Sequence, residues 1–313
     1  MVRSGENNDF LLELYHDSMS CEPDALRLRT LKNLQQILPF DFAVWGGGRA
    51  DDRMVTDLAV LDQSDAVLGD WEAVAHDDAF CDLTLTRLGQ TARFDDVANY
   101  RRSFAYNDHW RRFDASHMMA TITAEKSDGY VSFVGLCADG QRHAFSDTER
   151  AFKQALMPHL SQALRINRDL WTGRAAINSE AVAMIDRQGW ILSRQGRFDE
   201  IATEEWGARL CAIPPDVMRT LTGHGVWHGR AGSARLSTFG NACFIHLASQ
   251  PGLSLLTPRE REVAKLYAAD LTHRQVAAAL GTSPSTVRNQ LARVYDKLEI
   301  SSKTALSALF RHP

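Results

Sequence analysis

Apolar positions in the first half of the chain recur first with helical and then with strand-like spacing. Helical spacing predicts helices over 10–16 and 24–38. Apolar runs and apolar–polar alternation predict strands over 40–45, 53–62, 119–124 and 130–138. The glycine run 46–48 is predicted to end the first strand, because consecutive glycines usually form a turn. We therefore expect an αβ segment built around one sheet.

A capping box formed by Ser146 and Glu149 predicts the start of a long helix over 147–171. Apolar residues recur along it at helical spacing, and Pro158 lies inside it. We expect this helix to cover the sheet of its own segment. A dimer seam or a lever between domains is the alternative role.

The pattern changes after a short polar linker at 174–179. Two strands joined by a turn are predicted, followed by two helices and three more strands. The strands are 182–186, 190–193, 225–230, 233–239 and 242–248, and the helices lie near 198–206 and 215–222. This order predicts a second, smaller αβ domain with an antiparallel sheet.

The C-terminal segment is predicted to be entirely helical. N-cap residues at Thr257, Thr272 and Ser283 predict three helix starts, and a fourth helix begins near Ser301. Counting from His273, a small residue stands at the fifth position, a glycine at the ninth and a β-branched residue at the fifteenth. These are Ala277, Gly281 and Val287. Together they predict a helix-turn-helix, because the alanine lets two helices cross closely, the glycine allows the turn and the valine packs the third helix onto the second.

The segment from Leu256 to Leu298 closely resembles the DNA-binding domain of LuxR-type regulators, also called FixJ- or NarL-type. The resemblance is carried by Thr257-Pro258-Arg259-Glu260-Arg261-Glu262-Val263, Val276-Ala277, Leu280-Gly281, Ser283-Pro284-Ser285-Thr286-Val287-Arg288-Asn289 and Lys297-Leu298. This chain departs from the family pattern at Asp270, where glycine is usual, and at Ala292, where a lysine often reads bases. The resemblance implies a regulator that binds an operator in double-stranded DNA.

By element order, residues 1–172 resemble a GAF-type or related αβ sensor domain, and residues 173–250 resemble a PAS-like domain. With 253–313 as the LuxR-type domain, three domains are predicted. The predicted fold class is α+β multidomain, with antiparallel sheets in the sensor-like domains and an all-α C-terminal helix-turn-helix domain of four helices.

The third helix of such a domain enters the major groove, so it carries the predicted base contacts. Arg288 suits the guanine edge and Asn289 the adenine edge. Residues near the helix ends are predicted to contact phosphates. They are Arg274, Thr282, Ser285, Thr286 and Lys297. Lys297 could instead pair with Asp296 or Glu299. Because one helix reads only a half-site, a homodimer is expected.

The distribution of charged residues along the chain agrees with a DNA-binding C-terminal domain. Residues 251–313 carry nine Lys or Arg against five Asp or Glu, whereas residues 1–170 carry 18 against 27. A basic C-terminal segment on an acidic body suits a polyanionic partner. No apolar run approaches the length of a membrane span, so we expect a cytoplasmic protein with no membrane contact. The five cysteines are widely spaced, and no catalytic or metal-binding motif is present, so neither an enzyme nor a metal or cofactor is expected.

Aromatic residues crowd into the stretch from 71 to 113, interleaved with charged residues. Such clusters line small-molecule pockets, and they also fill ordinary cores. We predict a pocket for a small, apolar or aromatic effector. Its predicted lining is Trp71, Phe80, Tyr100, Phe104, Tyr106, Trp110 and Met118. The alternatives are control by a protein partner and sensing of an acyl-homoserine lactone, whose receptors carry a tryptophan, a tyrosine and an Asp-Pro pair that Trp71, Ala75 and Asp82-Leu83 match only in part.

Overall fold

The structure is a computed structural model that describes residues 4–125, 129–229, 231–240, 242–249, 255–298 and 300–311. The chain forms two compact units. The first comprises Met1–Arg174, Met184–Ser193 and Phe239–Cys243, and the second comprises Ala175–Ala183, Arg194–Thr238 and Phe244–Pro313. The predicted boundaries at 172 and 250 therefore remain a prediction. No helix in the described part of the chain has the length and apolar character needed to cross a membrane.

The first unit is built on a five-stranded sheet with the order β2-β1-β5-β4-β3. The strands are β1 (Phe42–Arg49), β2 (Val55–Leu61), β3 (Ala92–Arg93), β4 (His117–Ala124) and β5 (Tyr130–Ala138). Neighbouring strands pair antiparallel, with Trp45 opposite Val134 and Thr121 opposite Val134 on the other side. The central strand β5 is buried along nearly its whole length. Two faces of this sheet are thus available for helices.

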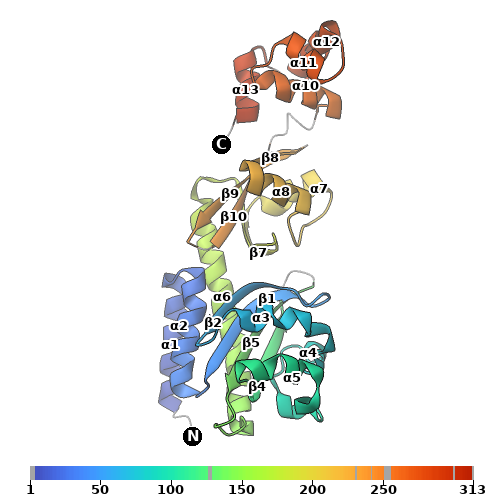
Figure 1. Cartoon of the computed structure of the whole chain (residues 1–313). Helices are drawn as coiled ribbons and strands as arrows, with labels where there is room; N and C mark the ends of the chain where they lie inside the picture. The colour runs from blue at the N-terminus through green and yellow to red at the C-terminus, as the bar shows by residue number, and fades with distance from the viewer. Residues whose placement is uncertain are drawn as a thin grey trace. The chain divides into compact units, whose positions relative to one another are not determined.

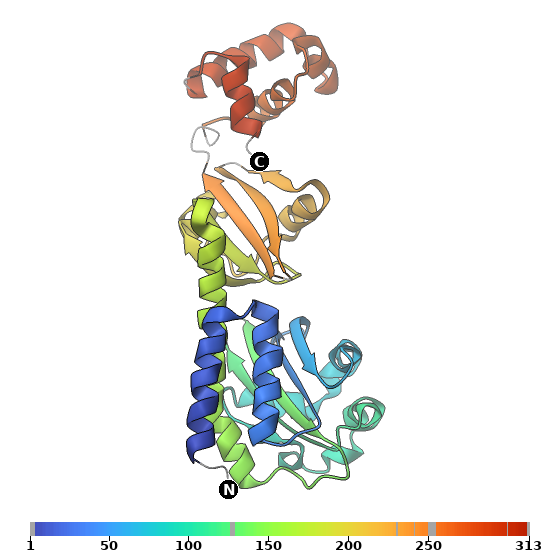
Figure 2. The same cartoon turned by 90° about the vertical axis from the view of Figure 1, so that its left-hand side faces the viewer.

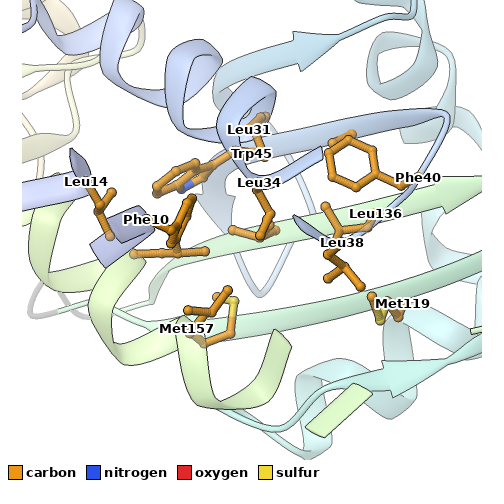
Figure 3. Close-up of a cluster of buried hydrophobic side chains, with 14 of the residues drawn as sticks. Phe10, Leu14, Leu31, Leu34, Leu38, Phe40, Trp45, Met119, Leu136 and Met157 are labelled. Atoms are coloured by element: carbon orange, nitrogen blue, oxygen red, sulfur yellow. The ribbon is translucent and has the colours of Figure 1, made fainter. Parts of the chain in front are cut away.

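Helices cover both faces of this sheet (Figures 1 and 2). One layer holds α1 (Ser4–Ser20), α2 (Pro23–Ile37) and the long α6 (Asp147–Ala175), and the other holds α3 (Ala66–Gly69), α4 (Ala79–Thr86) and α5 (Phe104–Asp108) with short 3₁₀ turns. Figure 3 shows the core of the first layer, where Phe10, Leu34, Trp45, Leu136 and Met157 meet. The long helix therefore covers its own sheet, as predicted.

The prediction that the glycine run 46–48 ends the first strand is wrong. These residues lie inside β1, which continues to Arg49, and do not form a turn. A Cβ on Gly46 would lie 2.6 Å from the ring of Phe133, and one on Gly47 would lie 2.6 Å from the hydroxyl of Tyr130. The glycines are needed because rings from the neighbouring strand cross over them.

A second five-stranded sheet has the order β7-β6-β10-β9-β8. Its strands are β6 (Ala181–Ile185), β7 (Ile191–Gly196), β8 (Val226–His228), β9 (Gly232–Phe239) and β10 (Ala242–Ser249), and its helices are α7 (Phe198–Trp206) and α8 (Pro215–His224). The predicted element order holds throughout. From residue 255 onward, the described residues form four helices: α10 (Pro258–Ala268), α11 (His273–Ala279), α12 (Pro284–Leu298) and α13 (Lys303–Arg311). The predicted fold class is confirmed.

Candidate functional site

The helix starts of the C-terminal domain are fixed by two complete capping boxes. The Thr257 hydroxyl accepts from the Glu260 backbone N–H, and the Glu260 carboxylate accepts from the Thr257 N–H at 2.9 Å. Thr272 and Gln275 repeat this reciprocal pair at the start of α11, where the Thr272 N–H donates at 2.8 Å. Each cap contributes about 1 kcal/mol by satisfying backbone donors that a helix start leaves open. The local sequence thus sets where these helices begin.

The helix-turn-helix crossing uses the three predicted residues. Ala277 and Val287 are buried in the core of the domain, and Gly281 has a left-handed φ of +60° between α11 and α12. Asp270, which stands where the family usually has glycine, also adopts a left-handed φ, of +67°. Aspartate tolerates this region better than most residues, and its carboxylate lies 3.2 Å from Nζ of Lys303. The departure at Asp270 therefore leaves the fold intact.

Helix α12 is sharply divided into two faces. Val287, Leu291 and Val294 are buried against the rest of the domain. Arg288 and Asn289 are exposed on the other side, as are Ser285, Ala292 and Arg293. An exposed, polar helix face held by a rigid core is what a duplex groove requires. The two side chains predicted to read bases are presented together.

The predicted phosphate contacts are placed less uniformly. Arg274 is exposed at the start of α11, and Thr282 is half-buried in the turn. Ser285 and Thr286 are exposed at the start of α12, where their hydroxyls lie 2.7 and 2.8 Å from that of Ser283. Three of these positions, Thr282, Ser285 and Thr286, lie at the amino-terminal end of α12, and Arg274 lies at the start of α11.

Lys297 has a different partner from those considered in the sequence. Its Nζ donates to Oε2 of Glu260 at 2.6 Å, which joins α12 to the start of α10. This hydrogen bond and those of Thr257 lower the pKa of Glu260 to about 2. The lysine charge is therefore engaged inside the domain, although we predicted a phosphate contact. Glu299 lies outside the described residues.

The aromatic stretch of the first unit is organised by a residue that the sequence analysis missed. Asp78 is 1% exposed and caps α4, accepting from the backbone N–H groups of Phe80 and Cys81. Its carboxylate also accepts from Nε1 of Trp71 at 2.9 Å, Nε1 of Trp110 at 3.1 Å and the Tyr100 hydroxyl at 2.8 Å. Burial and the nearby Asp78 charge raise the pKa of Tyr100, so its phenol stays protonated.

A small cavity of about 70 Å³ lies beside this carboxylate. Of the predicted pocket residues, four line it: Trp71, Phe80, Trp110 and Met118. Tyr100 and Tyr106 are buried next to them, with Tyr106 packed edge-on against Phe94. Phe104 does not belong to the group, because it starts α5 with its side chain 59% exposed. Among the described residues, no cluster of His, Cys, Asp or Glu side chains could hold a metal ion.

A family model matches the C-terminal domain. Residues 254–310 match the family model described as bacterial regulatory proteins, luxR family. A probable HTH-type transcriptional regulator, GfsR of Streptomyces halstedii, is 37% identical over 84 residues, which are 26% of this chain and 34% of that protein. A probable transcriptional regulatory protein, SgaR of Hyphomicrobium methylovorum, is 40% identical over 65 residues, which are 21% and 31% of the two chains.

The chain thus spans about a third of the length of these curated relatives. Among solved structures, Escherichia coli SdiA aligns over 97% of this chain and 96% of its own, with 10% identity and a TM-score of 0.40. This similarity is too low to assign a function. The capping boxes, the crossing at Ala277 and the family match over 254–310 agree, and the C-terminal domain of this chain is a helix-turn-helix domain of the luxR family.

Proposed function

We propose that this chain is a sequence-specific DNA-binding transcriptional regulator. The proposal rests on Arg288 and Asn289, which are both exposed on α12. The opposite face of this helix is buried in the core of the domain. In the major groove, arginine matches guanine O6 and N7, and asparagine matches adenine N6 and N7. Arg274, Ser285 and Thr286 would position the domain on the backbone.

The regulator acts as a homodimer in this proposal, because α12 is long enough to read only one half-site. The fourth helix of the domain offers apolar side chains for pairing. Leu306 is fully buried within its own domain and is thereby excluded from that role. Ala305 and Leu309 are half-buried on α13 and remain the candidates.

The input in this proposal is a small apolar or aromatic effector that enters the cavity beside Asp78. Trp71, Phe80, Trp110 and Met118 supply an apolar lining with one polar centre. The cavity of about 70 Å³ is far below the roughly 300–1,000 Å³ of typical ligand pockets. Binding must therefore move the rings, and this coupling of binding to a conformational change is what a sensor needs.

That small volume also supports an alternative, in which a protein partner controls the regulator and the rings form only a core. An acyl-homoserine lactone would need the same expansion of the cavity, together with a place on a carboxylate that already accepts five hydrogen bonds.

The DNA-binding proposal is tested by selecting duplexes from a random library with the full-length protein. Arg288→Ala should weaken binding to the selected duplex by about 1–3 kcal/mol and relax the preference at one base pair. Lys265→Ala is the matched control, since it removes an exposed positive charge from α10 in the same domain. Equal losses for the two variants, with unchanged selectivity, would refute the assignment of α12 as the reading helix.

The effector proposal is tested by native mass spectrometry of the purified chain and by a thermal-shift screen of apolar and aromatic compounds. Ala120 lines the cavity, so Ala120→Leu should fill it and abolish the shift. Ala124→Leu adds the same group at an exposed position of β4 and should leave the shift unchanged. If no compound copurifies and none raises the melting temperature, the partner-controlled alternative gains.

A further inference from the structure

A second candidate binding site lies in the second unit, on the face of its sheet opposite α7. A Cβ on Gly232 would meet Ile201 of α7 at 3.4 Å, so Gly232 faces that helix. Side chains alternate along a strand, which places Ser233 and Arg235 on the opposite face. Ser237 also lies there, and its hydroxyl bonds His246 of β10. This face is separate from the helix-turn-helix and from the Asp78 cavity.

A cavity of about 410 Å³ opens on this face. Its polar lining consists of Asn178, Ser179, Glu180, Ser233, Arg235 and His246. The volume is within the range of small-molecule sites, near its lower end. Its apolar lining consists of Val226, Ala234, Leu247 and Ala248. Apolar surface with several polar groups directed into the same space is typical of small-molecule sites.

His246, one of the lining residues, is held by hydrogen bonds at both ring nitrogens. Its Nδ1 lies 2.6 Å from the Ser179 hydroxyl and its Nε2 lies 2.7 Å from the Ser237 hydroxyl. The ring is 7% exposed, and burial together with the nearby Arg235 charge lowers its pKa to about 4. A neutral ring has one N–H and one bare nitrogen, so one serine accepts from it and the other donates to it. His246 therefore orients Ser179 and contributes no charge.

The charges around the cavity do not cancel. Glu180 is already engaged, since it accepts from the backbone N–H and the hydroxyl of Ser249 and pairs with Arg197 at 2.6 Å. The guanidinium of Arg235 has no hydrogen-bond or ion-pair partner within the residues that the structure describes. With His246 neutral, Arg235 leaves one uncompensated positive charge on a half-buried wall. We therefore expect a ligand with a single negative charge.

We propose that this cavity binds a small monocarboxylate that also carries a hydroxyl group. The planar carboxylate pairs with the guanidinium of Arg235, which offers two parallel N–H donors. The hydroxyl bonds the amide of Asn178 or the oriented hydroxyl of Ser179, and a short carbon chain contacts Val226. A phosphate dianion fits less well, because the lining has one unpaired cation and also contains the carboxylate of Glu180.

The test is isothermal titration calorimetry of the full-length protein with 3-hydroxybutyrate as the probe. We expect saturable binding of one equivalent through the millimolar range, and no binding of the neutral 3-hydroxybutyramide. Arg235→Gln should weaken 3-hydroxybutyrate by about tenfold or more, because it removes a charge-assisted bidentate pair. Arg219→Gln, at an exposed arginine of α8 in the same unit, should bind like the wild type.

A second variant covers the case in which Arg235→Gln does not fold. Arg235→Lys keeps the charge and loses the pair of parallel N–H donors, so its affinity for 3-hydroxybutyrate should lie between those of the wild type and Arg235→Gln. The proposal is overturned if acetate, butyrate and 3-hydroxybutyrate all fail to bind, if the amide binds as tightly as the acid, or if Arg235→Gln binds unchanged. It is also overturned if no acid binds and Arg235→Gln alters the mass in light scattering, because the face would then be an interface between two copies. DNA binding is not involved in these measurements, so their outcome is independent of the regulator proposal.

Discussion

Replacing Asp78 by asparagine isolates the contribution of one buried carboxylate, because the two side chains have the same shape. Oδ1 accepts from the Tyr100 hydroxyl and two backbone N–H groups, and Oδ2 accepts from the indoles of Trp71 and Trp110. An asparagine must place its NH₂ group against one of these two sets. At least two buried donors then lose their acceptor.

Each buried donor left unsatisfied costs about 1–3 kcal/mol, so Asp78→Asn should lower the free energy of unfolding by about 2–6 kcal/mol. For a unit of this size, 1 kcal/mol shifts the melting temperature by about 2–4 °C. A loss of about 4 kcal/mol therefore corresponds to about 8–16 °C. The assay is urea unfolding followed by tryptophan emission, with thermal melting as a second measurement.

Asp82→Asn is the matched control, four residues further along in the same helix. Its carboxylate is 56% exposed and pairs with Arg53 at the surface, where such pairs contribute about 0–1 kcal/mol. If Asp78→Asn and Asp82→Asn destabilise the chain to within about 1 kcal/mol of each other, the hydrogen-bond network does not organise this region.

Three further predictions concern Arg274, Lys153 and Glu260. Arg274→Ala should weaken all duplexes uniformly and lower the slope of log K against log salt by about 1, which titrations at several salt concentrations would measure. A retained slope would remove Arg274 from the phosphate contacts. Lys153 is fully buried, donates to the Thr121 hydroxyl at 2.6 Å, and has a pKa lowered by burial to about 7. The native state thus binds fewer protons than the unfolded state between about pH 7 and 10.5. Lys153→Met should therefore raise the free energy of unfolding in urea at pH 7, and this gain over the wild type should shrink as pH rises toward 10.5. A pH-independent difference would contradict this. The pKa of Glu260 is lowered to about 2, so its ion pair stabilises the domain above pH 4.5 and is lost as pH falls toward 2. Amide hydrogen exchange in α10 and α12 should therefore be faster in Glu260→Gln than in the wild type at pH 6, and the two rates should become equal near pH 2. A difference in rate that persists near pH 2 would exclude the charge of Glu260 as its cause.

The parts of the structure that the sequence predicted well are those determined locally. Thr257 and Thr272 begin helices through hydrogen bonds to residues three positions away, so their patterns could be read directly. The face of α12 followed from the spacing of Val287, Leu291 and Val294, because helical periodicity alone selects the buried side.

The parts that the sequence could not predict depend on distant partners. Gly46 and Gly47 belong to a strand because Phe133 and Tyr130 cover them, more than eighty positions away. Asp78 is buried because tertiary contacts bring Trp110 to it, and the sequence showed only one acidic residue among several. Its one local signal was the N-cap of α4. Likewise, the partner of Lys297 is Glu260, 37 positions away, and not a neighbour in the sequence.

The distant contacts also explain why the sequence predicted the exposed face of α12 better than the lining of the cavity beside Asp78. A helix face is a local property, whereas a cavity is the space left by many elements. Phe104 illustrates this, because it belongs to the aromatic cluster in sequence and points its ring to the surface in the fold. Met118, fourteen positions later, lines the cavity from β4.

Whether α12 reads DNA sequence can be measured by a competition experiment with the wild-type chain. A duplex selected from a random library is labelled, bound at one fixed salt concentration and competed with unlabelled selected or random-sequence duplex. If α12 reads the sequence, the selected duplex should compete about a thousandfold or more better than random DNA, the lower end of the range for specific regulators. Equal competition by the two duplexes would show that the domain binds only the charged backbone, and would contradict the account.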